Sequence, residues 1–517
     1  MNGGPIKKVY RLQENRYYSR DDLARGLGDC SPEDVSAFVK YMRECEVCKS
    51  KPNDKKVSFQ YVGIVEFSCT DEPSPSERRI VFIEPKFFPE DRAVDTAEGM
   101  DAAQKIILKA ILKYRKDQQI SLFSNGHITS YEGCSPRLST YLALVIDVME
   151  KGIYQVPKVE LVVNGLGDTD WNETFATVDP FFLQDGPCYV NTVSREIGYD
   201  DDTYISRLQM CLATKCLAYF EDIGIAEPLG LFLESPYDGE LSDFGSESYQ
   251  QYRIANELRT QFVDDKKQTL KLMEAVLEDK AYGSDSLEFQ SFGISGFHAL
   301  WEKAIKEVFC DELEKSPGMV FNDEELGKLI NGDKSFKTKQ NIPLKEFIDA
   351  PQWIKPGTDD EGVIASNTDG EADRLKPDFV AVPRKDDKAS ALVILDAKYY
   401  RPEFKEHSIA AAPGVGDVDK QVLYQVAYNG IVQSCKLDVH NAFIFPMWRL
   451  NWNDDTEIYS ELFARVRVPS LAAIVEKPEF NAYMLDGMAL LKRYVYNDSD
   501  DDHVSLMKIF EGEKTCP

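Results

Sequence analysis

The chain has 517 residues, of which 43% are hydrophobic, 11% aromatic and 29% charged. This length predicts two to four folded units, and the balanced composition excludes a disordered, collagen-like or membrane protein. The formal net charge of −28 predicts that most of the surface repels nucleic acid. A surface that attracts nucleic acid must therefore be local, as in residues 371–405, where eight Lys and Arg accompany seven Asp and Glu.

The distribution of apolar and cysteine residues predicts a cytoplasmic protein without a membrane partner. No run approaches the length of about 18 apolar residues that a membrane span needs, and no apolar segment follows Lys7 and Lys8. The 11 cysteines are scattered and odd in number, which favours reduced thiols. Cys45 and Cys48 have the spacing of zinc ligands, but no second pair completes a zinc site.

The first 56 residues carry 12 Lys and Arg against nine Asp and Glu and have a helical pattern. Ser19 is placed to cap a short helix that ends at Gly26 or Gly28, and Pro32 begins a second helix. With the alternating residues 57–62, residues 1–56 are interpreted as a winged-helix-like unit that reads DNA. The alternative is a helical pair that packs on its own chain.

Residues 57–280 are predicted to contain a β-hairpin followed by helices. Residues 57–67 and 79–87 alternate as paired strands do, and residues 57–120 are interpreted as a hairpin plus helix that docks a partner. Residues 121–280 form a helix-rich middle region. In that part of the chain we expect helices at 101–116, 139–151, 203–220 and 250–280, a strand at 159–163, a loop at 164–186, and linkers at 235–248 and 280–286.

Residues 281–517 are assigned to one domain, which contains the sharpest local pattern. Two apolar segments, residues 376–383 and 391–400, flank a polar turn and predict a hairpin. If the turn is centred near Asp387, Asp378 lies opposite Asp396 with Cβ atoms about 4.5–5.5 Å apart. Lys398 is two residues beyond Asp396 and projects to the same face of the strand.

Two buried carboxylates at the end of an apolar sheet are costly unless a cation compensates them. Oxygen ligands of this kind suit Mg²⁺, which keeps several waters and bridges to phosphate. A lysine beside the ion, here Lys398, orients the attacking water. Taken singly, Asp378 suits a turn and Lys398 suits a strand end, but their joint occurrence with Asp396 favours a catalytic site.

Pro377-Asp378 and Asp396-Ala397-Lys398 resemble the PD-(D/E)xK signature of the restriction-endonuclease-like nucleases. The resemblance implies Mg²⁺-dependent hydrolysis of DNA phosphodiesters, with Mn²⁺ as a substitute. It also implies an α/β fold in which a helix, here within 296–313, precedes the hairpin, and a second helix, 417–433, leads to strand 441–446. Asp378, Asp396 and the Ala397 carbonyl would be the metal ligands.

The same resemblance suggests further site residues on the two helices. Relatives place a glutamate on the first helix as a metal ligand or water-positioning group, and Glu302 is our choice over Glu307 and Glu312. Gln421, Gln425 and Tyr428 share one face of the second helix, where some relatives carry a QxxxY motif, although this chain has QxxY instead. That face either lines the DNA groove or is the polar side of a packed helix.

A wider resemblance covers most of the chain. Residues 61–64, 80–87 and 167–174, followed by the nuclease motif, are similar to the LlaJI-type restriction endonucleases and to McrC nuclease subunits. In that group the nuclease works beside a separate McrB-like AAA+ GTPase, on which the N-terminal half docks.

The sequence therefore predicts a mixed α/β protein with a C-terminal PD-(D/E)xK core, acting as the Mg²⁺-dependent DNA endonuclease subunit of a bacterial phage-defence restriction system. Its partners would be double-stranded DNA and the GTPase. The alternative is a non-enzymatic activator that docks on a motor NTPase and has a secondary or inactive nuclease fold.

Overall fold

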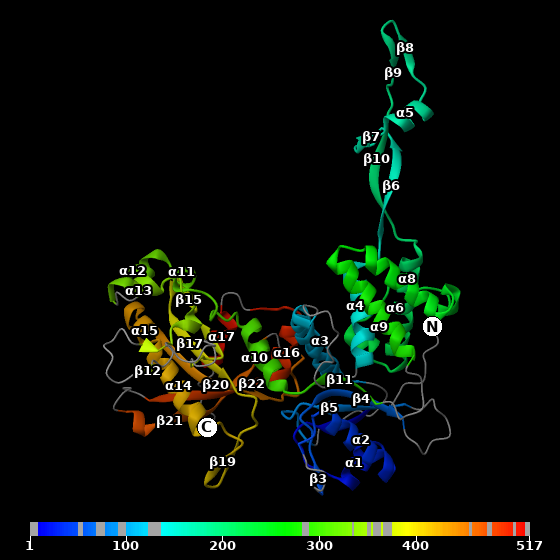
Figure 1. The fold of residues 1–517 in the computed structure, drawn as a ribbon. Coiled ribbons are helices and arrows are strands. Elements are labelled where there is room, and N and C mark those ends of the chain that lie inside the picture. The colour runs from blue at the N-terminus through cyan, green and yellow to red at the C-terminus, as the bar shows by residue number, and fades with distance from the viewer. Residues whose placement is uncertain are drawn as a thin grey trace.

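The computed structural model describes residues 9–49, 55–68, 78–90, 100–122, 136–281, 289–332, 336–348, 353–354, 363–364, 375–453, 457–472, 478–499 and 503–511. They form an N-terminal sheet with a helical bundle above it, a C-terminal lobe beside them, and a long arm that projects from the bundle (Figure 1). This mixed architecture agrees with the fold class predicted from the sequence. Within the described ranges, no helix has the length and apolar character required to cross a membrane.

The N-terminal sheet has the strand order β1-β5-β4-β11. Its members are β1 (Val9–Gln13), β4 (Val62–Ser68), β5 (Arg78–Glu84) and β11 (Gln290–Ile294). The predicted hairpin is present, but its first strand is broken: β3 (Lys56–Val57) pairs with β2 (Tyr18–Ser19), and β4 begins only at Val62. The sequence did not predict β11, which comes from the segment just before the C-terminal lobe.

Helices α1 (Arg20–Gly26) and α2 (Pro32–Glu44) begin at Ser19 and Ser31, whose side chains accept backbone N–H groups of the first turn. Their apolar faces pack on the N-terminal sheet, where Leu23 and Phe38 share a core with Val65. Residues 9–49 therefore pack together with the strands that follow them, which is the arrangement expected of a helical pair on its own chain.

The helical bundle consists of α4 (Pro136–Lys151), α6 (Tyr204–Asp222), α8 (Glu247–Thr260) and α9 (Asp264–Ala281), with the short α7 (Ala226–Leu229) at one end. The single helix predicted at 250–280 is interrupted between Thr260 and Asp264. The linker predicted at 235–248 is wrong, because the turn η2 (Leu241–Phe244) buries Phe244 in the core. Most of the second predicted linker, 280–286, lies outside the described residues.

The arm comprises residues 156–200 and reverses the direction of the chain far from the bundle (Figure 1). Its strands are β6 (Val156–Val163), β7 (Asp168–Thr169), β8 (Phe181–Leu183), β9 (Gly186–Cys188) and β10 (Val193–Asp200). The loop predicted at 164–186 is wrong in part, because it contains α5 (Trp171–Thr177). Asp170 starts this helix by accepting the N–H groups of Asn172 and Glu173, a capping signal that the Gly- and Asp-rich composition obscured.

The C-terminal lobe is built on a five-stranded sheet of order β14-β17-β20-β22-β21. Its strands are β14 (Phe379–Ala381), β17 (Ala391–Ala397), β20 (Asp438–Met447), β21 (Ser460–Arg467) and β22 (Glu479–Asp486). Helices α10 (Phe297–Val308), α14 (Val415–Ala427), α15 (Asn429–Cys435), α16 (Gly487–Val495) and α17 (Val504–Glu511) surround it, and α11 (Pro317–Val320) and α12 (Asp323–Gly332) lie at one edge. The helix–hairpin–helix–strand order predicted for residues 296–446 is thus present.

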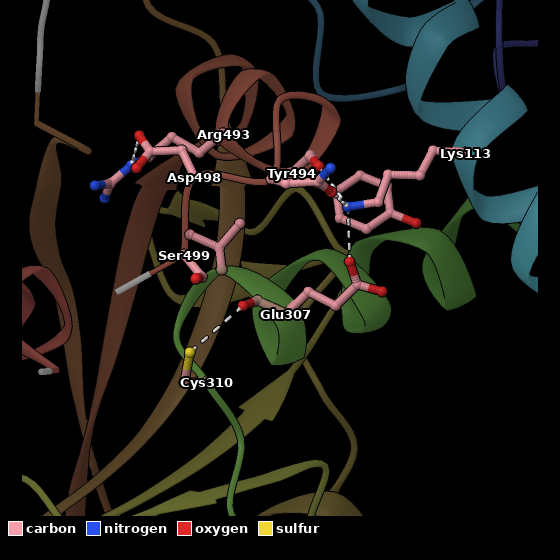
Figure 2. A pocket seen from close by; sticks show the side chains of 9 residues that line it. Lys113, Glu307, Cys310, Arg493, Tyr494, Asp498 and Ser499 are labelled. Carbon is pink, nitrogen blue, oxygen red and sulfur yellow. Dashed lines mark hydrogen bonds and ion pairs between the residues drawn. The ribbon is translucent and has the colours of Figure 1, made fainter. Parts of the chain in front are cut away.

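Helix α3 (Ala102–Leu122) joins the two halves by packing on α10 and α16. Figure 2 shows Lys113 of α3 reaching into a cavity of about 260 Å³ at this joint. Its ammonium lies 2.8 Å from Glu307 Oε2, donates to the Tyr494 carbonyl at 2.7 Å, and lies 4.1 Å from the Tyr494 ring centre. These interactions occupy Lys113 and fix the N-terminal half against the C-terminal lobe.

Candidate active site

The hairpin β14–β17 brings the two predicted aspartates together. Phe379 pairs with Leu395, and continuing this register by one residue sets Asp378 beside Asp396, as the sequence predicts. The connection turns at Asp386 and Asp387, which both have positive φ, at the position expected for a two-residue hairpin turn. The backbone N–H of Ala397 donates to Asp378 Oδ2 at 3.0 Å, so the aspartate is anchored to the strand that carries its partner.

Lys398 connects the hairpin to helix α14. Its ammonium lies 3.1 Å from Asp396 Oδ2 and 3.1 Å from Asp417 Oδ1. Burial alone would lower the pKa of Lys398, but the two carboxylates outweigh it and the pKa is raised. Lys398 therefore stays protonated near neutral pH and holds a fixed positive charge beside Asp396.

The two aspartates differ in how their charge is compensated. Burial, followed by the negative charge of Asp396, raises the pKa of Asp378 to about 7. Asp396 is 5% exposed, and its buried Oδ1 atom has no hydrogen-bond partner among the described residues. The site thus contains more carboxylate charge than the surrounding side chains neutralise.

These groups fit a divalent cation. An orphaned buried carboxylate oxygen is costly, and a cation held between Asp378 and Asp396 would remove both that cost and their repulsion. Within the described residues, no group of three or more His, Cys, Asp and Glu side chains is arranged for metal binding. A two-carboxylate set completed by the Ala397 carbonyl and waters is typical of Mg²⁺.

A cavity of about 670 Å³ contains the predicted site residues Asp378, Ala397, Lys398 and Glu302. Glu302 forms an ion pair with Lys306 on the same helix and does not join the aspartates in one metal-binding group. Its two rivals do not line this cavity: Glu307 contacts Lys113 at the joint, and Glu312 Oε2 accepts the Val382 N–H at 2.8 Å. Of the three glutamates, Glu302 is the one that lines this cavity.

The predicted DNA-contacting face of α14 is largely enclosed. Gln421 and Tyr428 are both 0% exposed; Gln421 Nε2 donates to Asn441 Oδ1 at 2.6 Å, and the Tyr428 hydroxyl donates to the Leu344 carbonyl at 2.9 Å. Gln425 is partly exposed but accepts from Asn441 Nδ2 at 3.2 Å. This burial favours the packed-helix interpretation, because these amide and hydroxyl groups already form hydrogen bonds with neighbouring strands and loops.

Several site residues were missed from the sequence. Asp417 lies one helical turn before Gln421, and this spacing could have indicated that both residues share one face of the helix. Glu14, Lys86 and Tyr399 also line the cavity, but two of them belong to the N-terminal sheet region. Tyr399 directly follows the D-x-K motif, whereas nothing in the local pattern around Glu14 or Lys86 indicates proximity to residues 300 positions away.

Two comparisons with known proteins show what this chain is similar to. The family model described as LlaJI restriction endonuclease matches residues 61–320 and 333–466. The chain belongs to the LlaJI restriction endonuclease family. The chain is also similar to the "Type II restriction enzyme BsuMI component YdjA" of Bacillus subtilis (strain 168), which is 25% identical over 486 residues that cover 91% of this chain and 88% of the relative. Both matches support a role in a restriction system, and the family match spans the hairpin that carries Asp378, Asp396 and Lys398.

Proposed function

We propose that the protein is a Mg²⁺-dependent DNA endonuclease subunit of a bacterial restriction system. The observation that carries the proposal is that Asp378 and Lys398 line one cavity while Asp396, ion-paired to Lys398, lies buried next to them. Among the described residues, Oδ1 of Asp396 has no hydrogen-bond partner. Membership of a restriction endonuclease family and the word "component" in the relative's name support a nuclease that acts as part of a larger enzyme.

Each residue of the site has a distinct role. Asp378, Asp396 and the Ala397 carbonyl hold the metal, which, when bound, withdraws charge from the phosphate and lowers the pKa of water. Lys398, fixed between Asp396 and Asp417, orients the attacking water and stabilises the added negative charge at phosphorus. Glu302, which lines the same cavity, positions water or metal.

The test is cleavage of plasmid DNA by the full chain in Mg²⁺ and in EDTA, alongside Lys398→Ala. The assay is run with and without the McrB-like GTPase of the same system. Cutting that requires metal and disappears in the variant would support the assignment. Cutting that persists in Lys398→Ala, or in EDTA, would refute it.

The GTPase partner is part of the proposal, and the arm supports it. Large apolar side chains on the arm are exposed, among them Phe182 at 81% and Ile197 at 73%. Exposed apolar surface of this extent is typical of a docking site. In contrast, β4, β5 and the apolar face of α3 within residues 57–120 are buried in the core. Within the N-terminal half, we propose that the arm binds the motor.

The same arm favours the second candidate, an activator without nuclease activity. A chain with Asp396→Ala separates the two functions, because the substitution leaves the arm unchanged. If that chain stimulates GTP hydrolysis while the unmodified chain never cuts DNA, the activator function replaces the nuclease. Loss of stimulation after Phe182→Ser, with Met319→Ser as an exposed control outside the arm, would assign docking to the arm.

A further inference from the structure

Lys86 belongs to the N-terminal region but lies at the proposed active site. It follows the last residue of β5, Glu84, by two positions and lines the same cavity as Asp378 and Lys398. The cavity wall also includes Glu14, which directly follows β1. One wall of the site is thus made by the N-terminal sheet and the other by the C-terminal lobe.

The backbone of Lys86 is tied to the strand that carries the D-x-K motif. Its N–H lies 3.3 Å from Glu14 Oε2 and 3.3 Å from the Tyr399 hydroxyl oxygen. The Tyr399 hydroxyl donates to the same Glu14 oxygen at 2.6 Å. Glu14 and Tyr399 are 5% and 6% exposed, so these bonds are shielded from water. The position of Lys86 is therefore set relative to Lys398, the residue just before Tyr399.

The ammonium of Lys86 is held differently from those of the other lysines nearby. It lies 4.2 Å from the ring centre of Tyr399 and 5.6 Å from that of Tyr400. Among the described residues it has no carboxylate within ion-pair distance, whereas Lys398 has two. Lys86 is also half-buried, whereas Lys49 on the same wall is exposed and donates to Asn15. Lys86 thus offers a partly desolvated positive charge to the cavity.

We propose, on the basis of the nuclease function above, that Lys86 binds a backbone phosphate of the DNA next to the scissile bond. A phosphate oxygen would replace the weaker contact with the aromatic rings by a charge-assisted hydrogen bond. The backbone of Lys86 is linked through Glu14 to Tyr399, the residue after Lys398. The phosphate contact would therefore fix the position of the DNA relative to Lys398. The N-terminal sheet thereby supplies a substrate-positioning residue to the active site.

The test measures DNA binding by the full chain, with Ca²⁺ in place of Mg²⁺ and a fluorescein-labelled duplex as the probe. Lys86→Met keeps the aliphatic stem over Tyr399 and removes the charge, and Lys86→Arg restores the charge. Lys109→Met is the matched control, because Lys109 is also half-buried and lies 5.6 Å from a tyrosine ring, that of Tyr496, but does not line the cavity.

We expect Lys86→Met to weaken binding by about tenfold and to reduce the slope of log Kd against log salt concentration by about 1. Lys86→Arg and Lys109→Met should keep the slope of the unmodified chain. The salt slope counts phosphate contacts, so a lysine that only balances the charge of Glu14 would not change it. A Lys86→Met chain with a lower melting temperature and an unchanged slope would overturn the proposal.

Cleavage in Mg²⁺ separates this proposal from the nuclease function on which it rests. If the unmodified chain binds and cuts DNA, and Lys86→Met binds and cuts equally well, the Lys86 proposal is wrong and the nuclease function stands. If the unmodified chain neither binds nor cuts DNA with any divalent metal, with or without the GTPase, the nuclease function fails and the Lys86 proposal falls with it.

Discussion

The hairpin β14–β17 and the arm depart from the usual distribution of side chains in opposite directions. The hairpin buries charge: Asp396 is 5% exposed, and one of its oxygens has no hydrogen-bond partner. The arm exposes apolar surface: Phe182 and Ile197 are 81% and 73% exposed although both lie in or beside strands. Each arrangement costs stability or solubility in the isolated chain.

Each departure is of the kind that a binding partner outside the chain compensates. Two close carboxylates are compensated by a cation, and an exposed apolar strand surface is compensated by another protein. Departures from local rules are expected at functional sites. The two regions also differ in what surrounds them. The hairpin lies in a five-stranded sheet, whereas the arm extends beyond the bundle.

The largest effect is expected at the buried carboxylate. Asp396→Ala should reduce DNA cleavage by about 10³-fold or more, since it removes a proposed metal ligand and a partner of Lys398. Asp419→Ala, on α14 and outside the cavity, is the control and should keep activity. Cleavage is measured as plasmid nicking in Mg²⁺, and circular dichroism checks the fold. Nicking by Asp396→Ala at the unmodified rate would break the assignment.

The next effect contrasts the stability of the two regions directly. Ile394→Ser in β17 should lower the free energy of unfolding by about 3 kcal/mol or more, because it leaves a hydroxyl and a cavity in a fully buried strand. Ile197→Ser on the arm should change it by less than about 0.5 kcal/mol. Urea denaturation followed by circular dichroism measures both. Equal destabilisation by the two variants would show that the arm packs against the chain in solution.

A smaller effect is expected at Glu302. Glu302→Gln should slow cleavage by about tenfold, because a neutral amide positions water or metal less well than a carboxylate. Glu307→Gln, on the same helix but at the joint with Lys113, should leave the cleavage rate within about twofold. Single-turnover cleavage distinguishes them. A larger loss in Glu307→Gln than in Glu302→Gln would move the functional glutamate to the joint.

The smallest effect concerns pH and the metal-free protein. Burial, and then the charge of Asp396, raises the pKa of Asp378 in the folded state from its ordinary value of 3.8 to about 7. Between these two pH values Asp378 is protonated in the folded state but ionised in the unfolded state. Proton binding by Asp378 therefore stabilises the folded state, and this stabilisation is lost as pH rises through about 7. Asp378→Asn should stabilise the metal-free chain near pH 8 by on the order of 1 kcal/mol and flatten this dependence.

Melting temperatures in EDTA between about pH 5 and pH 8 measure this effect. Adding Mg²⁺ should stabilise the unmodified chain more near pH 8 than near pH 5, because metal binding requires the deprotonated carboxylate. Asp378→Asn should lose most of that stabilisation. A melting temperature of the unmodified chain that rises with pH in EDTA, and to the same extent in Asp378→Asn, would contradict the assigned charge state.

Much of the C-terminal lobe was predictable because its signals are local. The alternation of residues 376–400 and the turn at Asp386 and Asp387 set the hairpin register, and the register sets Asp378 beside Asp396. The apolar stripe of α10 likewise marks a helix at Phe297–Val308. In contrast, the loop and linker predictions at 164–186 and 235–248 failed because capping side chains such as Asp170 and a buried Phe244 outweighed polar composition.

The sequence by itself determined the helix starts at Ser19 and Pro32, the hairpin, and the two aspartates with their lysine, because each depends on residues close in the chain or on strand periodicity. Only the tertiary structure decided which glutamate lines the cavity, that Gln421 and Tyr428 are enclosed, and that Lys86 lines the same cavity as Lys398. It also decided that β11 joins the N-terminal sheet immediately before α10. These outcomes depend on packing between segments that lie from 20 to more than 300 residues apart, and no local pattern encodes that packing.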